Sequence, residues 1–131
     1  MDWVADTIDS FGRACGIFGL ALDAEGLLCL SIEGDRVLTL RDLARAGGDE
    51  VLVIMQAAMP FPHGTAARAA LSLADFRRST GPAPQLAMED DDLVATLRIP
   101  RNSFVHSSLE EAVDALLEFH RRAAQADGGR P

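Results

Sequence analysis

Residues 18–43 read FGLALDAEGLLCLSIEGDRVLTLRDL, and this stretch decides the fold class. Apolar residues alternate with small or polar ones in three short runs, Phe18–Leu22, Leu28–Ile32 and Val37–Leu43. Two acidic, glycine-containing turns, Asp23–Gly26 and Glu33–Asp35, separate the runs. A period of two is typical of strands with one buried face, so the stretch predicts an antiparallel meander of three strands.

Both flanks of the meander change to a helical period. Residues Asp2 to Cys15 are predicted as a helix because apolar residues recur every three or four positions on one face. The last helix is predicted to open at Ser107-Ser108 and to end in a tail, residues 127–131. Its predicted buried stripe is Leu109, Val113, Leu116, Leu117 and His120.

The middle of the chain adds strands and a further helix. Val51–Ala57 is continuously apolar and predicts a central strand covered on both faces. Pro60 and Pro62 end it, and a helix is predicted over roughly residues 66–78. Gln85–Met88 and Leu93–Ile99 are predicted as a hairpin around a charged tip. We therefore expect an α+β fold: a single domain over residues 1–126, an antiparallel β-sheet and three helices, in the order α-β-β-β(-β)-α-β-β-α.

Composition excludes several classes of partner. The 131 residues carry a net charge of −8, and all twelve basic residues are arginine. An acidic chain is a poor ligand for nucleic acid or for an anionic membrane, since both need cations on the protein. No basic region followed by an apolar run begins the chain, and no apolar run is long enough for a membrane span, so neither a signal peptide nor a span is expected.

The residues that carry catalytic or metal chemistry are few. Cys15 and Cys29 are expected to be buried free thiols, because two cysteines are too few for a disulfide framework. The carboxylates from Glu89 to Asp92 lack the spacing of a calcium loop and are expected to form a solvated turn. His63 and His106 fit no nucleophile motif, so no enzyme, metal or cofactor is expected; a small enzyme using either histidine is a remote alternative.

The apolar strand positions point to a binding role. Six alternating segments present more apolar faces than three helices can cover. Large exposed apolar patches usually mark protein–protein surfaces. Dimerisation alone could also cover them, and the pattern does not choose between the two interpretations. Trp3 is likewise open to two interpretations, a cap on the core or an exposed anchor for a partner.

One run resembles a known family. The opening helix leads into GIFGLALDAEG at residues 16–26, followed by the strands LLCLSIEGD and RVLTL; VLVIMQAAMPFP precedes the middle helix, and a Leu-rich acidic helix closes the chain. In this order and size, over about residues 2–125, the chain resembles a class I type III secretion chaperone of the Tir-chaperone-like family. The middle helix departs from the pattern because it is short and Ala-rich.

The resemblance implies a cytoplasmic bacterial homodimer without enzymatic activity or cofactor. Its partner would be the N-terminal segment of a secreted effector, a virulence protein kept soluble and competent for export, with the secretion ATPase as a further partner. Carried over by position, the effector-binding residues would be Val4, Ile8, Phe11, Phe18, Leu20, Leu28 and Leu30. The dimer interface would be Leu71, Leu73, Phe76, Leu86 and Met88. A regulatory or adaptor protein of the same fold, YbjN-like or sequestering a regulator, is the main alternative.

Overall fold

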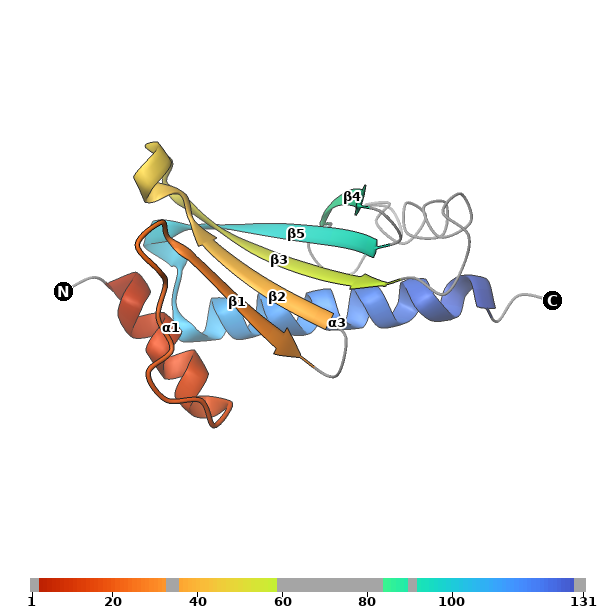
Figure 1. Ribbon diagram of the computed structural model, residues 1–131, viewed down its shortest axis with the longest axis horizontal. Helices are drawn as coiled ribbons and strands as arrows, with labels where there is room; N and C mark the ends of the chain where they lie inside the picture. The colour runs from red at the N-terminus through yellow and green to blue at the C-terminus, as the bar shows by residue number, and fades with distance from the viewer. Residues whose placement is uncertain (1–2, 33–35, 59–83, 90–91, 129–131) are drawn as a thin grey trace.

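The computed structural model describes residues 3–32, 36–58, 84–89 and 92–128, with the side chains of residues 124–128 left aside. Five strands form one antiparallel sheet in the order β1-β2-β3-β5-β4. Two α-helices, α1 (Trp3–Ala14) and α3 (His106–Gly128), lie on the same face of it (Figure 1). The strands are β1 (Leu27–Ile32), β2 (Arg36–Asp42), β3 (Glu50–Ala58), β4 (Gln85–Glu89) and β5 (Asp92–Pro100). Two short 3-10 helices, η1 (Leu43–Ala46) and η2 (Arg101–Ser103), follow β2 and β5.

The core lies between the sheet and the two helices. Strand side chains alternate, so every second residue of β2, β3 and β5 points to the inner side of the sheet, along which α3 runs lengthwise (Figure 1). The buried cluster contains Leu38, Val53, Leu97 and Leu116, together with Ile8 from α1. The α+β fold is thus confirmed, as is the central position of β3, which pairs with β2 on one side and β5 on the other.

The opposite face of the sheet carries no described helix. Leu52, Ile54 and Val94 point to this side and are half-buried. The prediction that the central strand is covered on both faces is therefore fulfilled on the inner face only, within the residues described. The predicted middle helix, at residues 66–78, lies outside the described residues, so the described part of the chain holds two α-helices rather than three.

The first predicted strand is wrong. Residues 17–22 form an irregular connection that returns alongside α1 to the start of β1 (Figure 1). Gly16 and Gly19 adopt left-handed backbone angles, φ 82° and 77°, which an extended strand does not allow. The amide of Ile17 donates to the carbonyl of Gly12 (2.7 Å), so the chain turns back onto the helix and Leu20 packs against α1.

The cysteine prediction is also wrong in one respect. Both thiols are free, but both are exposed. Cys15 follows the end of α1, and Cys29 points to the uncovered face of β1, where its sulfur lies 3.4 Å from the hydroxyl of Thr39. Alternation places Cys29 opposite to Leu28 and Leu30, and only those leucines face the core.

Candidate peptide-binding surface

β1 forms one edge of the sheet, and its backbone is available for pairing over a short length (Figure 1). The amide of Asp42 donates to the carbonyl of Gly26 (2.9 Å). This bond shows which residues along β1 form hydrogen bonds with β2. Antiparallel hydrogen bonding alternates, so Leu28 and Leu30 direct their backbone groups toward β2. Cys29 and Ser31 direct theirs outward, and no described residue pairs with them.

At the start of the same edge, Asp23 occupies both outward backbone groups of Leu27. Its carboxylate accepts from the amides of Leu27 (3.0 Å) and Glu25 (2.8 Å), and its own amide donates to the carbonyl of Leu27 (2.8 Å). These two amide donors, Leu27 first and Glu25 second, hold the pKa of Asp23 below its ordinary value. The edge that is open to a partner strand therefore begins after Leu27.

Apolar side chains line the inner side of this edge. Leu28, Leu30 and Ile32 are half-buried and pack against the core, with Leu22 from the preceding connection. We call Leu28, Leu30 and Ile32 the β1 ledge. A strand added beside β1 would place every second side chain on the same face as the ledge, which gives both backbone and side-chain contacts.

Among the described residues, the most exposed large apolar side chain is Phe18, which is 74% exposed. It lies in the connection after α1, with Ile17 also exposed, and the Arg13 guanidinium sits 5.6 Å from its ring centre. Arg13 is held in place by Asp9, one helical turn earlier, at 2.8 Å. An exposed aromatic ring beside an arginine can bind an apolar side chain of a partner.

The predicted effector-binding residues separate into two groups. Four of them are buried in the core, and their side chains are not on the surface of the chain: Val4, Ile8, Phe11 and Leu20. Phe18 is exposed, and Leu28 and Leu30 are half-buried at the open edge. Sequence periodicity cannot separate the groups, because a residue that faces the core and one that faces a groove have the same spacing.

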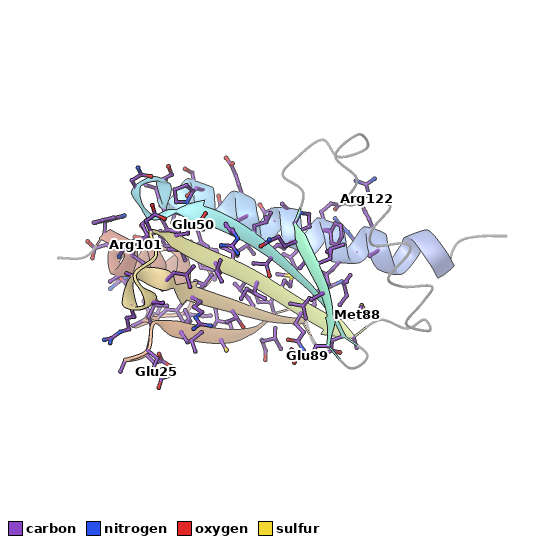
Figure 2. All side chains as sticks on the ribbon, turned by 90° about the horizontal axis from the view of Figure 1, so that it is seen from above. Glu25, Glu50, Met88, Glu89, Arg101 and Arg122 are labelled. Atoms are coloured by element: carbon purple, nitrogen blue, oxygen red, sulfur yellow. The ribbon has the colours of Figure 1, made fainter. Side chains whose placement is uncertain are left out.

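The predicted dimer residues separate in the same way. Leu71, Leu73 and Phe76 lie outside the described residues. Leu86 and Met88 are half-buried on the inner face of β4, where they pack with Phe119 against Leu93 and Ala123. Met88 and Glu89 lie at the end of the sheet opposite to Arg101 and Glu50 (Figure 2). The role of these residues in a dimer stays a prediction.

Trp3 is bound to its own chain, and its role as an anchor for a partner stays a prediction. It is 47% exposed, yet its indole N–H donates to the carbonyl of Arg101 (2.7 Å). The Arg101 guanidinium stacks 4.9 Å from the Trp3 ring centre and pairs with Asp42 through two bonds, Nε–Oδ1 at 2.9 Å and Nη2–Oδ2 at 3.1 Å. Val105, nearby in sequence, is another exposed apolar residue that the sequence did not single out.

The described residues offer little for catalysis or metal binding. No group of three or more His, Cys, Asp or Glu among them could hold a metal ion. His106 contacts the ring of Phe11 and lies 3.7 Å from Glu110, and neither partner is a nucleophile of the Ser or Cys kind. His63 falls outside the described residues. Within the described part of the chain, no helix is long and apolar enough to cross a membrane.

An acidic chain in which the described residues leave an apolar-lined sheet edge unpaired and an aromatic side chain exposed has the features of a peptide-binding protein. The comparison with known families is consistent with this class. Residues 6–123 match the model of the Tir chaperone protein (CesT) family, and the chain belongs to that family.

Solved structures with the same fold include several chaperones with their partners. One is described as the HopA1-SchA chaperone-effector complex (24% identity, TM-score 0.68, 92% of this chain and 91% of the other). A chain of the ExsC-ExsE complex has 16% identity and a TM-score of 0.77, and the match covers 95% of this chain and 92% of the other. The Yersinia pestis type III secretion chaperone SycH, in complex with a fragment of YscM2, has 14% identity and a TM-score of 0.65. The match covers 88% of this chain and 94% of the other. A search of curated proteins gave no match.

Proposed function

We propose that this protein is a type III secretion chaperone that binds the N-terminal segment of a secreted effector and keeps it soluble and competent for export. The observation that carries the proposal is membership of the Tir chaperone family over residues 6–123. The fold shared with the HopA1-SchA chaperone-effector complex and with the type III secretion chaperone SycH supports it. The family is one of chaperones, and the contacts of His106 give no support to the enzyme alternative.

The open edge of β1 suggests how the segment is held. An extended peptide would pair with the outward backbone groups of Cys29 and Ser31 and lay alternate apolar side chains along the β1 ledge. Each square ångström of apolar surface removed from water contributes about 25 cal/mol, less the cost of ordering the peptide. Backbone pairing makes the affinity tolerant of sequence, and the ledge and Phe18 select apolar residues at alternate positions.

The experiment is a binding assay with Ser31→Pro. Proline removes the outward amide of Ser31 and places its ring against an incoming strand, while the β1–β2 ladder stays intact because that amide does not face β2. Ser31→Ala, which keeps the amide, is the matched control. Against the first ~100 residues of an effector encoded beside the chaperone gene, we expect a loss of affinity of at least about tenfold for proline only.

Equal binding by both variants would reject pairing at β1, while leaving the chaperone assignment to be judged by the wild type. Co-purification from the native host judges that assignment. Recovery of one secreted protein, retained through its N-terminal segment, supports the chaperone. Failure to retain any secreted protein would count against it.

We further propose that the protein acts as a homodimer in the bacterial cytoplasm and hands its cargo to the secretion ATPase. Light scattering on a size-exclusion column would report about 28 kDa for two chains of 14.0 kDa. A mass near that of one chain would reject the homodimer. The assigned interface, Leu71, Leu73, Phe76, Leu86 and Met88, is tested by the same measurement on polar substitutions.

A regulatory role is the second candidate. The Escherichia coli protein YbjN, described as a putative transcription regulator, shares the fold (17% identity, TM-score 0.56, 95% and 91% coverage). The two candidates differ in what is bound. Recovery of a DNA-binding regulator instead of a secreted protein in the co-purification would favour the regulatory role.

A further inference from the structure

A polar pocket of about 390 Å³ lies at the end of the β1 ledge. Among the described residues, Arg36 at the start of β2 lines it together with one flank of α3, namely Asp114, Leu117, Glu118 and Arg121. Arg36 pairs with Ile32, the last residue of the ledge, and residues paired in this way point to the same face of a sheet. Ile32 packs against the core, so Arg36 also points to the inner side, and the pocket adjoins the ledge.

The flank of α3 that lines this pocket is the one on the side of β1. The sheet order places β1 and β2 on one side of β3, and β5 and β4 on the other. The opposite flank of the helix lies beside β5, where Ser108 and Glu111 line a second pocket with Leu97 and Ile99. A segment bound at the open edge of β1 therefore lies on the side of Asp114 and not on the side of Glu111.

Asp114 is a carboxylate of the pocket that has no partner among the described residues. The residue is exposed, and it forms no hydrogen bond or ion pair with them. Glu118 pairs with Arg121, three residues later, and Arg36 already interacts with another group. The pocket therefore offers one unpaired negative charge, next to the half-buried apolar side chain of Leu117.

The neighbouring sequence adds charge of the same sign. The segment between Ile32 and Arg36 lies outside the described residues, and its sequence is Glu-Gly-Asp, residues 33–35. It can contribute only negative charge, and the whole chain carries a net charge of −8. A basic side chain fits such a pocket better than an acidic one, because complementary charge favours specific pairing.

We propose that this pocket is a subsite for an arginine or lysine side chain of the bound segment. The subsite rests on the proposed function and adds a specificity to it. A strand paired with the outward groups of Cys29 and Ser31 directs every second side chain to the inner side, and the last of these lies beside Ile32. From there a long basic side chain can lay its methylene stem along Leu117 and bind Asp114 with its charged end.

The subsite predicts a pattern in the cargo. Inner-facing positions of an extended segment are two residues apart, so an arginine or lysine lies two positions beyond the apolar residues on the β1 ledge, at the end of the run nearest Ile32. Apolar contacts alone would accept an alternating segment in either direction. The basic residue at one end distinguishes the two directions in which the segment could lie.

The test compares Asp114→Asn with Glu111→Gln in the full chain. Both variants remove one negative charge from the exposed side of α3, but Glu111 lies on the flank beside β5. The probe is the same effector segment as in the Ser31→Pro experiment. In about 50 mM salt, we expect Asp114→Asn to raise the dissociation constant by about threefold to fivefold and Glu111→Gln to raise it by less than about 1.5-fold.

A double-mutant cycle identifies the occupant. Each arginine and lysine of the effector segment is replaced by glutamine in turn, and its affinity is measured for the wild type and for Asp114→Asn. One replacement should weaken binding to the wild type about as much as Asp114→Asn does, and should have no further effect on that variant. The residue two positions from it in the segment should be apolar.

The outcomes separate the subsite from the chaperone assignment. If the wild type binds the segment, equal affinities of the two variants, or the absence of any coupled basic residue, would overturn the subsite alone. A gain in affinity for Asp114→Asn would indicate an acidic occupant and would overturn it as well. Failure of the wild type to bind the segment would count against the proposed function, and the subsite would be rejected with it.

Discussion

At the scale of single residues, Arg101 connects three segments that are far apart in the chain. Its guanidinium binds both carboxylate oxygens of Asp42 and stacks on Trp3, and its amide donates to the carbonyl of Asp49 (2.8 Å). Asp42 also caps η1 by accepting from the amide of Ala44 (3.0 Å). Asp42 is only 7% exposed, so its charge depends on Arg101 for compensation.

Removing that compensation should be costly. We expect Arg101→Met to lower the free energy of unfolding by about 3 kcal/mol, because it leaves the buried carboxylate of Asp42 with one amide donor and removes the stacking on Trp3. Arg98→Met is the matched control, since Arg98 pairs with Glu50 (3.0 Å) at the surface and should cost about 0.5 kcal/mol. Urea titrations of both variants measure the difference in the free energy of unfolding. Equal losses would show that the buried Asp42–Arg101 pair stabilises the fold no more than the surface pair does.

Residue types alone did not indicate these roles. The sequence predicts Trp3 as either a core cap or an anchor for a partner, and only the position of Arg101, 98 residues later, shows that its indole N–H is bound within the chain. The same limit explains the exposed Cys29. Its apolar neighbours suggest burial, but alternation places its side chain on the face that no described helix covers.

At the scale of elements, the connection after α1 shows where periodicity fails. Phe18, Leu20 and Leu22 have the spacing of a strand, yet the left-handed angles at Gly16 and Gly19 return the chain onto α1. The strands that did follow the prediction, β1 to β5, each pair with at least one neighbouring strand. A run of two-residue period identifies a strand only if a neighbour is available to pair with it.

Gly12 makes this connection possible, and its substitution tests the explanation. A Cβ at this position would lie 2.8 Å from both the carbonyl oxygen of Ile17 and the Cβ of Leu20, closer than real contacts allow. We expect Gly12→Ala to destabilise the fold by about 1–2 kcal/mol, even though alanine is the better helix former.

The control for Gly12→Ala is Gly16→Ala, which meets open space and costs only the strain of its left-handed angle, about 1 kcal/mol. Chemical unfolding combined with proton-exchange rates around Leu20 separates the two effects. Slower exchange or unchanged stability in Gly12→Ala would show that the connection does not depend on the close approach.

At the scale of the whole molecule, the balance of charge gives the proposed binding surface a second property besides its apolar ledge. Twenty acidic and twelve basic residues leave a net charge of −8, and the exposed side of α3 contributes Glu110, Glu111 and Asp114. Long-range attraction accelerates the encounter of oppositely charged partners and is screened by salt, whereas apolar burial is not. The two contributions to binding can therefore be separated by ionic strength.

For a basic effector segment, we expect the association rate to fall by about tenfold between about 50 mM and 500 mM salt, with a much smaller change in the dissociation rate.

The dissociation rate should instead respond to the apolar contacts. We expect Phe18→Ser to raise it by about tenfold at either salt concentration, because Phe18 is 74% exposed and its loss leaves the core intact. Surface plasmon resonance resolves both rates. Exposed Val37→Ser, on the uncovered face of β2, is the matched control and should change neither. An association rate independent of salt would show that the acidic surface serves some purpose other than recruiting the segment, and an unchanged dissociation rate for Phe18→Ser would remove Phe18 from the binding surface.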